Sequence, residues 1–385
     1  MNYLSEVAKK YPASGIRRMH DLASEYEDII NLTIGEPDFD TPQNIIEAAK
    51  NALDQGYTHY SSNAGIQELR EAIANYYKKY TNEYTSKNII ITVGAMEAIY
   101  LSLVTTINPG DEVLIPNPCF PNYEGQIMMV GAKPVPVPLF EKNNFKIRAE
   151  DIEKVITDKS KAILLNYPSN PLGSVLGKDD INEIAEVVKK YDLIVFSDEV
   201  YDKIIYDDDN YCSILENSDI RDKVIVINSL SKSYAMTGWR IGYLVGNEKI
   251  TSHMTKLQEG IVSCVPTFIQ KAAVQAITNS EDSTKEMVSH YKRRRDILID
   301  GLNSIPGISC LKSSGSFYAF TNIKSFKKPS MQFAKELMKE AKVLAVPGSA
   351  FGTNGEGYLR FVFATSEESL NEAVKRINQY IRKNY

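Results

Sequence analysis

One lysine stands out because residues suited to binding a phosphate surround it. Lys232 lies in the segment LSKSYAMTGWRIGYLVG (230–246), between two apolar strand-like runs, whereas most lysines are surface residues. An ordinary lysine, with a pKa of about 10.4, is a poor nucleophile, so burial or neighbouring cations must lower that pKa. Ser229 and Ser231 flank Lys232, and Arg240 follows it. An arginine and two hydroxyls around one amine suit a phosphate bound beside a reactive amine.

An acidic residue follows another buried-looking strand. In LIVFSDEVY (193–201), Asp198 comes after an apolar run, where a carboxylate is costly unless it meets a cation or several donors. It could be a helix N-cap, or the acceptor for a protonated ring nitrogen in a cofactor that serves as an electron sink. Tyr201 could face the same cleft or pack with its hydroxyl at the surface.

Two strand exits offer further binding groups. Gly94–Met96 follow a β-branched run and begin a helical pattern, so they either supply free N–H groups to a phosphate or only make a tight turn. The strand that ends at Asn166 leads into YPSNPLG, a rigid turn. That turn makes Asn170 either an ordinary turn residue or an amide held against a cofactor oxygen.

Seven apolar, β-branched runs alternate with segments of helical period, such as Asp180–Tyr191. Strands that are apolar throughout predict an α/β fold, with a mainly parallel seven-stranded sheet sandwiched by helices. Ligands bind at the carboxyl ends of such strands, where the residues above lie. The runs are Asn88–Val93, Glu112–Pro116, Lys133–Pro138, Ala162–Asn166, Leu193–Asp198, Val224–Ser229 and Gly242–Gly246.

The last hundred or so residues read as a smaller α+β domain. A long helical pattern over Glu281–Ile305 leads to strands at Ile308–Leu311 and Phe317–Thr321, and a helix from Met331. Strands at Val343–Val346 and Tyr358–Phe363 and a final amphipathic helix follow. We therefore expect residues 45–279 to form the large cofactor-binding domain and residues 280–385 the small C-terminal domain. Residues 1–44 would form an N-terminal arm and part of the small domain.

Composition excludes several classes of protein. The 385 residues are 43% hydrophobic and carry a net charge of −5, with no basic tract that would indicate a nucleic-acid surface. The four cysteines form no CxxC pair, and with four histidines they predict neither a metal site nor a disulfide framework. No signal peptide and no membrane span is evident. These features predict a soluble, cytoplasmic protein.

Three motifs, taken in this order, resemble those of the class I/II pyridoxal-5′-phosphate (PLP)-dependent aminotransferases of fold type I. They are NYPSNPLG (166–173), SDEVY (197–201) and SLSKSYAMTGWRIGY (229–243). Further similar segments, including LTIGEPDFDTP (32–42), GSFYAF (315–320), VPGSAFG (346–352) and GYLRFVFA (357–364), extend the resemblance over nearly the whole chain. Within this family, the chain most resembles the aspartate and aromatic aminotransferases of bacteria and archaea.

The resemblance implies roles for the residues around the cofactor ring. Lys232 would carry PLP covalently and shuttle a proton between substrate and cofactor. Asp198 would hold the pyridine nitrogen protonated, while Tyr201 and Asn170 would hydrogen-bond the phenolic oxygen. Phe120 matches the aromatic residue that stacks on the ring.

It also implies a phosphate site and a substrate site. The turn that begins at Gly94, through the backbone of Ala95 and Met96, would hold the phosphate together with Ser229, Ser231 and Arg240; Ser231 could equally be a loop hydroxyl that faces solvent. Arg360 would clamp the substrate α-carboxylate, helped by Asn170 and the backbone at Gly35. Tyr60 matches a residue that reaches the phosphate of the neighbouring subunit, which implies a homodimer.

Two departures bear on the substrate. Met96 stands where some aspartate-preferring members carry a lysine, and Phe120 replaces a tryptophan common among aspartate enzymes. The chain is thus more similar to aromatic or broad-range members, with a 2-oxo acid such as 2-oxoglutarate as acceptor. Aspartate aminotransferase is the alternative, followed by a PLP-dependent β-lyase. We do not expect a ligand-sensing transcription regulator, because such proteins carry a DNA-binding domain ahead of these motifs and the motifs here begin by Leu32.

Overall fold

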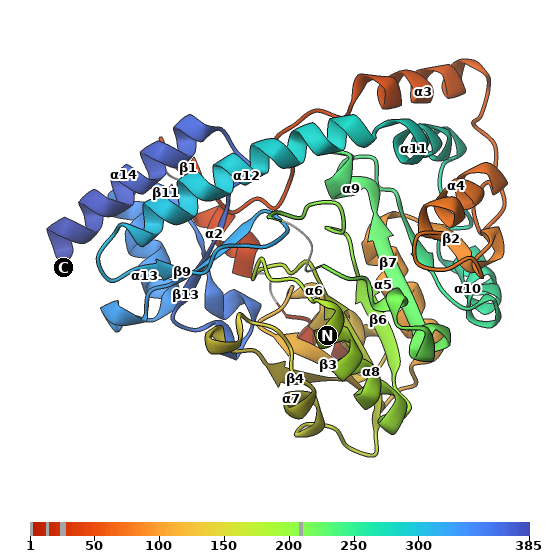
Figure 1. Ribbon diagram of the computed structural model, residues 1–385, viewed down its shortest axis with the longest axis horizontal. Helices are drawn as coiled ribbons and strands as arrows, with labels where there is room; N and C mark the ends of the chain where they lie inside the picture. Colours follow the sequence, from red (N-terminus) through yellow and green to blue (C-terminus); the bar gives the residue numbers. More distant parts are fainter. Residues whose placement is uncertain (1–2, 13–14, 24–27, 208–210) are drawn as a thin grey trace.

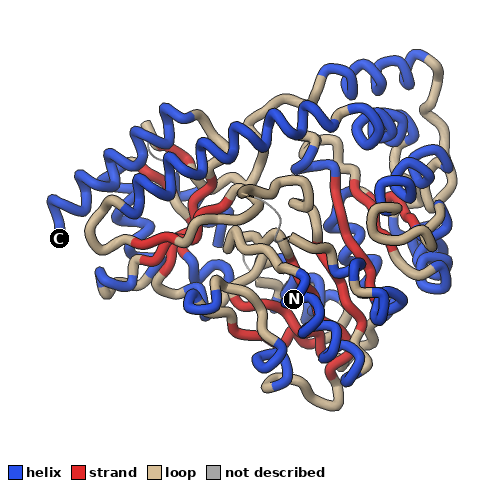
Figure 2. The backbone as a smooth tube through the Cα atoms, viewed as in Figure 1, coloured by secondary structure: helices blue, strands red, loops and turns tan. Residues whose placement is uncertain are grey.

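The computed structural model describes residues 3–12, 15–23, 28–207 and 211–385, and its central element is a seven-stranded sheet (Figures 1 and 2). The strand order is β2-β8-β7-β6-β5-β3-β4, and β8 alone runs against the other six. Each strand overlaps one predicted run, which confirms the mainly parallel sheet. The strands are β2 (Ile89–Thr92), β3 (Glu112–Asn117), β4 (Lys133–Pro138), β5 (Ser160–Asn166), β6 (Ile194–Asp198), β7 (Val224–Ser229) and β8 (Gly242–Val245).

Both faces of this sheet are buried except at the edge strand β4, which explains why its inner strands are mostly apolar. Alternate residues point to opposite faces, so Ile89 and Ile91 belong to one core cluster and Ile90 to another. The core with Ile90 includes α5 (Gly94–Thr106), α6 (Asn122–Met129) and α10 (Glu248–Ile261). The other core includes α3 (Gln43–Asp54), α4 (Gln67–Tyr77), α7 (Ala149–Glu153), α8 (Lys178–Tyr191) and α11 (Thr267–Asn279).

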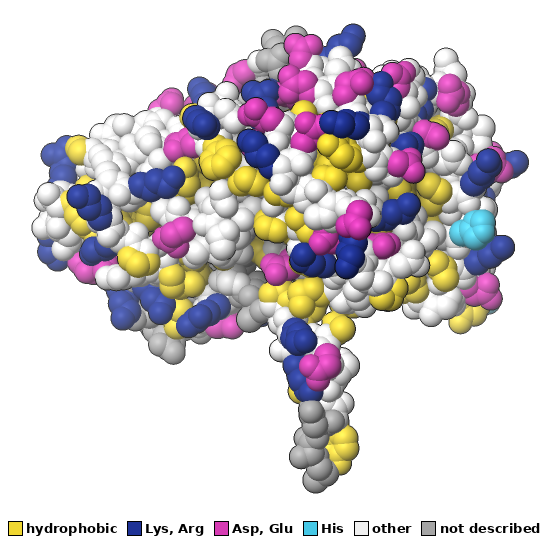
Figure 3. All heavy atoms as spheres, turned by 90° about the horizontal axis from the view of Figure 1, so that it is seen from below, with side chains coloured by type: hydrophobic (Ala, Val, Ile, Leu, Met, Phe, Trp, Pro, Cys, Tyr) yellow, Lys and Arg dark blue, Asp and Glu magenta, His cyan; other side chains and the backbone are white. Residues whose placement is uncertain are grey.

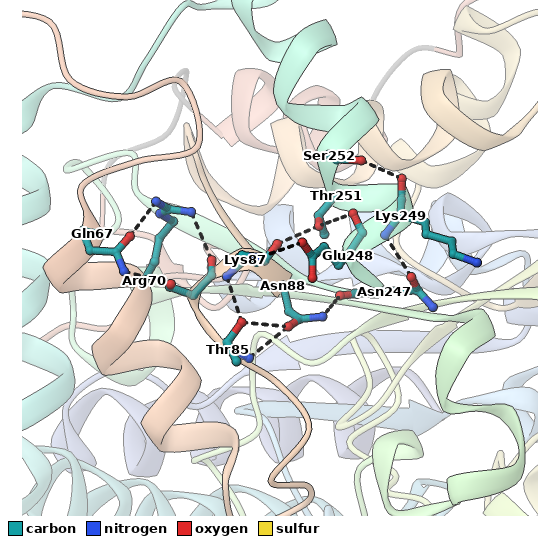
Figure 4. A network of polar contacts seen from close by, with 12 residues as sticks. Gln67, Arg70, Thr85, Lys87, Asn88, Asn247, Glu248, Lys249, Thr251 and Ser252 are labelled. Carbon is teal, nitrogen blue, oxygen red and sulfur yellow. Dashed lines mark hydrogen bonds and ion pairs between the residues drawn. The ribbon is translucent and has the colours of Figure 1, made fainter.

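The reversed strand β8 brings the start of one strand beside the ends of others. β8 pairs antiparallel with both β2 and β7. Its first residue, Gly242, therefore lies opposite Thr92 and Ser229, the last residues of those strands, and the chain just before Gly242 lies at that edge of the sheet. At the opposite edge, side chains join the turn before β2 to the residue after β8 and to α10 (Figure 4). There the Asn88 amide donates to the Gly246 carbonyl at 2.9 Å, and the Thr251 hydroxyl donates to the Lys87 carbonyl at 2.8 Å.

A second, smaller region holds a four-stranded antiparallel sheet of order β12-β13-β10-β9. Its strands are β9 (Ser309–Cys310), β10 (Tyr318–Asn322), β12 (Val346–Pro347) and β13 (Tyr358–Val362). The helices α12 (Glu281–Asn303), α13 (Ser330–Glu336) and α14 (Glu367–Asn384) pack on this region, and α12 runs toward it from the large sheet (Figure 1). This arrangement places one wall of the functional site on each region.

The strand predicted over Val343–Val346 is two separate strands. β11 (Val343–Leu344) pairs in parallel with β1 (Ile30–Asn31), whereas β12 pairs with β13 in the other sheet. The run is apolar throughout because all its residues are buried, so its pattern could not reveal the change of partner at Ala345. Two residues are also too few to show a period, which is why β1 was not predicted.

The N-terminal residues lie outside the main body. The short helix α1 (Glu6–Lys10) has no buried residue and belongs to the narrow projection in Figure 3, and Tyr3 and Leu4 are exposed. The next helix, α2 (Gly15–Ala23), returns to the body and buries Met19. Within the described ranges, no helix is long and apolar enough to cross a membrane.

Candidate active site

A cavity of about 740 Å³ lies at the edge where the parallel strands end, between the two regions. All the residues singled out from the sequence line it, except Gly94, which directly precedes two of them, and Tyr60. The residues brought together are Gly35, Ala95, Met96, Phe120, Asn170, Asp198, Tyr201, Ser229, Ser231, Lys232, Arg240 and Arg360.

Lys232 supplies a partly buried amine to the cavity. It lies in the short helix α9 (Leu230–Ser233), directly after β7, and its Nζ donates a 2.6 Å hydrogen bond to the Gly35 carbonyl. Burial lowers the pKa of the Lys232 ammonium to about 8; Arg240 and Arg360 act in the same direction and Glu36 opposes them. About a tenth of the amines are then neutral at pH 7, far more than for a solvated lysine.

Asp198 supplies a buried carboxylate at the end of β6. Tyr123 donates to its Oδ2 at 2.6 Å, and the Val200 N–H donates to Oδ1 at 3.3 Å. Burial raises the pKa of Asp198 to about 6, although these two hydrogen bonds act to lower it. No helix begins after Asp198, so it is not a helix N-cap. A cationic N–H donor in the cavity would relieve the cost of burying this charge.

Arg360 provides a buried cation on the opposite wall, in β13, where it is 1% exposed. Its Nη1 donates to the Asn170 Oδ1 at 3.1 Å, and its Nη2 donates to the Thr33 carbonyl. The buried Nε has no partner, and no carboxylate pairs with Arg360 among the residues that the structure describes. The guanidinium carbon also lies 4.7 Å from the centre of the Tyr318 ring. A buried guanidinium with a spare donor suits a bidentate carboxylate ligand.

The rigid turn after β5 holds Asn170 in place. The Asn166 Oδ1 accepts the Asn170 N–H at 2.9 Å, while the Asn166 amide donates to the Asp198 carbonyl at 3.1 Å. Asn170 is therefore fixed from β5 and bonded to Arg360, which an ordinary solvent-facing turn residue would not be. The Tyr201 hydroxyl lies 2.7 Å from that of Tyr318, inside the same cavity.

A third group of donors surrounds the start of α5. Gly94 has a φ of +70°, and a Cβ there would lie 2.6 Å from Nη2 of Arg240. The first N–H groups of a helix have no partner within it, so they offer an anion site. Nearby, the Ser229 Oγ donates to the Ser231 Oγ at 2.8 Å, and both serines are buried. Ser231 is thus a buried hydroxyl at the cavity and does not face solvent.

Two predicted residues lie differently from the rest. Phe120 lines the cavity and packs edge-on against Tyr123, with ring centres 5.5 Å apart. Tyr60 is 91% exposed and does not line the cavity of its own chain. Its position is compatible only with contacts outside that cavity.

Several cavity residues were not assigned from the sequence, and three of them contact the predicted ones. Tyr123 and Tyr318 contact Asp198 and Tyr201, and the Thr33 carbonyl accepts from Arg360. Tyr318 lies in GSFYAF (315–320), one of the segments that resemble the family, but the resemblance implies no role for this tyrosine. Tyr123 had no signal, since only the packing of α6 turns its hydroxyl toward Asp198.

Known proteins share both the sequence and this architecture. The family described as aminotransferase class I and II matches residues 27–377. The chain is 42% identical to aromatic-amino-acid aminotransferase 2 of Thermococcus litoralis, over 99% of this chain and 98% of that protein. It is 44% identical to an aspartate aminotransferase of Pyrococcus abyssi, over 96% of both.

Solved structures agree with these matches. The crystal structure of an aromatic aminotransferase from Pyrococcus horikoshii superposes with a TM-score of 0.90 at 42% identity, over 95% of this chain and 99% of that one. The aspartate aminotransferase from Thermus thermophilus with maleate has a TM-score of 0.92 at 31% identity, over 99% of this chain and all of that one. This chain therefore belongs to the class I and II aminotransferases.

Proposed function

We propose that the chain is a PLP-dependent enzyme that moves an amino group between an aromatic or other apolar amino acid and a 2-oxo acid such as 2-oxoglutarate. The observation that carries the proposal is the convergence of Lys232, Asp198 and Arg360 on one cavity, from three different elements. These side chains supply an amine with a lowered pKa, a buried carboxylate and a buried guanidinium with a spare donor.

The residues present fit the cofactor. Asp198 suits a protonated ring nitrogen, because such a partner would compensate for its burial. The start of α5, Ser229, Ser231 and Arg240 suit the phosphate, and the absence of a Cβ at Gly94 leaves the Arg240 guanidinium its place. Phe120 offers an aromatic face beside the cavity, and Asn170 and Tyr201 offer donors for the phenolic oxygen.

Bound PLP supplies the electron sink that stabilises negative charge on the substrate α-carbon. The protein's own side chains orient the substrate and transfer the proton. Arg360 holds the substrate carboxylate through two donors, which fixes the orientation of the Cα–H bond. Lys232 takes and returns the proton at its Nζ, since an amine whose pKa is near 8 both accepts and releases protons near neutral pH. Asp198 holds a positive charge at the ring nitrogen.

The preference for apolar substrates rests on the cavity wall. Met96 and Phe120 are apolar residues in that wall, and the relative from Thermococcus litoralis is named for aromatic amino acids. Aspartate aminotransferase is the second candidate, because the equally similar relative from Pyrococcus abyssi carries that name.

We place the active unit as a cytoplasmic homodimer in which Tyr60 reaches the neighbouring subunit's cavity. Support comes from the 91% exposure of Tyr60 and from the exposed apolar side chains of Tyr3 and Leu4 in the N-terminal arm. The division into an arm and part of the small domain (1–44), a large domain (45–279) and a small domain (280–385) is supported by the two separate sheets, because the seven-stranded sheet lies within residues 89–245 and the four-stranded sheet within residues 309–362.

The visible absorption spectrum of the purified protein tests this function. We expect a visible band from lysine-bound cofactor in the untreated enzyme. Borohydride reduction should make the cofactor resist washing in the wild type, but not in Lys232→Ala. Tyrosine or phenylalanine should convert the band to that of the amine form faster than aspartate does. Faster conversion by aspartate would favour the second candidate, and the absence of any band with added PLP would refute the proposal. Pyruvate release from cystathionine without an amino acceptor would indicate a β-lyase.

A further inference from the structure

One arginine outside the cavity is buried against a segment that borders it. Arg294 lies on α12, is 8% exposed and does not line the cavity. Its Nη1 donates to Oδ1 of Asp38 at 2.7 Å, and its guanidinium carbon lies 5.0 Å from the centre of the Phe39 ring. Tyr291, also on α12, packs edge-on against Phe39. Loss of either charged partner would leave the other uncompensated, so the two side chains hold each other in place.

One half of this ion pair belongs to residues 33–41, a segment that supplies two carbonyls to the cavity. The Gly35 carbonyl accepts from Nζ of Lys232 at 2.6 Å, and the Thr33 carbonyl accepts from Arg360. The segment is therefore bonded both to the amine and to the carboxylate clamp. Its position decides whether an acceptor stands beside the amine.

The helix that carries Arg294 is also fixed to the helix that carries Lys232. The Thr284 hydroxyl, on α12, donates to the Ser233 carbonyl of α9 at 2.7 Å. Thr284 and Arg294 are ten residues apart on one continuous helix, which is about 15 Å along its axis. Because α12 is bonded at one point to α9 and at the other to residues 33–41, it sets the distance between them (Figure 1).

We propose that Arg294 is a positioning residue for proton transfer by Lys232: through Asp38 it holds the Gly35 carbonyl at the Lys232 amine. The amine has to keep one orientation while it takes and returns a proton, and an acceptor at 2.6 Å fixes that orientation. Arg294 acts from outside the cavity, through the segment that it anchors. The inference deepens the proposed function and rests on it.

The groups that face Lys232 give this role a measurable sign. Burial lowers the pKa of the Lys232 ammonium, and four charged side chains act on it as well: Glu36 and Asp198 raise it, and Arg240 and Arg360 lower it. The Gly35 carbonyl also favours the ammonium, because it accepts a hydrogen bond from it. Gly35 and Glu36 both belong to the segment that Arg294 anchors. Releasing that segment should therefore lower the pKa of Lys232.

The test measures how the rate constant for PLP capture by the apoenzyme depends on pH. In Arg294→Met, which keeps an apolar side chain against Phe39, the midpoint should move downward by about half a pH unit to one unit, since an acceptor and a negative charge no longer hold the proton on Lys232. Arg294→Lys keeps the ion pair and should restore most of the midpoint. Asp38→Asn, at a more exposed position, should lower the midpoint in the same way and makes the test if Arg294→Met does not fold.

Arg295→Met is the matched control, because Arg295 is a buried arginine of the same helix that pairs with Asp207 and not with residues 33–41. It should lose stability in thermal unfolding, while its midpoint stays within about 0.2 unit of wild type. A wild-type midpoint in both Arg294→Met and Asp38→Asn, or an equal shift in Arg295→Met, would overturn the inference while leaving PLP capture intact. Failure of the wild-type apoenzyme to capture PLP would instead overturn the proposed function.

Discussion

The hydroxyl of Tyr123 donates a 2.6 Å hydrogen bond to Oδ2 of Asp198, and both side chains are buried. The bond joins α6, which packs on one face of the large sheet, to the end of its strand β6. It lowers the pKa of Asp198 against the effect of burial, so that this carboxylate keeps its charge near neutral pH.

Tyr123→Phe is therefore expected to weaken cofactor binding. Losing the donor raises the pKa of Asp198 above about 6 and leaves the carboxylate less charged at pH 7. A hydrogen bond to a charged group contributes about 1.5 kcal/mol, so the Kd for PLP should rise about tenfold. Titration of the apoenzyme with PLP measures it. Tyr206→Phe is the control, since Tyr206 donates an equally short buried bond, to the Ser316 carbonyl, but does not line the cavity. Similar losses in the two variants would argue against a specific role for Tyr123.

Capture of PLP by the apoenzyme is expected to depend on pH through Lys232. Only the neutral amine reacts, so the rate constant should rise about tenfold per pH unit below pH 8 and level off above it. Stopped-flow absorbance between pH 6 and 10 would record this. In Arg360→Gln the midpoint should move upward, because a cation that lowers the pKa has gone. A wild-type midpoint above about pH 10 would mean that Lys232 behaves as a solvated lysine.

Gly94→Ala is expected to weaken PLP binding by tenfold or more. The new Cβ would lie 2.6 Å from Nη2 of Arg240, so the guanidinium would have to leave its place beside the start of α5. Gly56→Ala isolates the backbone contribution, because Gly56 also has a positive φ, of +77°, with open space around it. Both variants should lose stability through backbone strain, but only Gly94→Ala should lose affinity for PLP. If the two variants bound PLP with equal affinity, Arg240 would not be a ligand of the phosphate.

Asp198→Asn is expected to stabilise the apoenzyme at neutral pH. Folding raises the Asp198 pKa from its ordinary value to about 6, so between about pH 4 and 6 the folded state binds a proton that the unfolded state has lost. Stability then falls as pH rises through that window, by up to about 3 kcal/mol from this group. Thermal unfolding of the apoenzymes at pH 5 and pH 7.5 would show a smaller pH difference in Asp198→Asn. The same variant should lose affinity for PLP, and a loss of both stability and affinity would indicate a purely structural aspartate.

The large sheet could be predicted because its strands are buried on both faces and rich in β-branched residues. Strand exits could be located for the same reason, and they led to Gly94, Asp198 and Lys232. The reversed direction of β8 could not be predicted, because an apolar run looks the same in either direction. Its direction brings Arg240, two residues before β8, to the edge where β7 ends just before Lys232.

The rest of the site depends on packing between distant segments. Arg360 meets the Thr33 carbonyl across more than 300 residues, and Tyr123 meets Asp198 across 75. Contacts between segments this far apart leave no local sequence pattern. Arg360 was therefore predicted only from the family resemblance. Arg294 lies in the basic run KRRR (292–295) of a helical pattern, which is typical of a solvated face, and only its packing against Asp38 and Phe39 buries it.

The antiparallel pairing of β8 also bears on the order in which the protein folds. The connection from β7 to β8 is only twelve residues, residues 230–241, and it carries Lys232 near one end and Arg240 near the other. By contrast, β8 and β2 pair across about 150 residues. Loop closure is faster and loses less chain entropy when the loop is short. The hairpin of β7 and β8 is therefore expected to form before the sheet closes, so the lysine and the arginine become neighbours while the rest of the cavity is still unfolded.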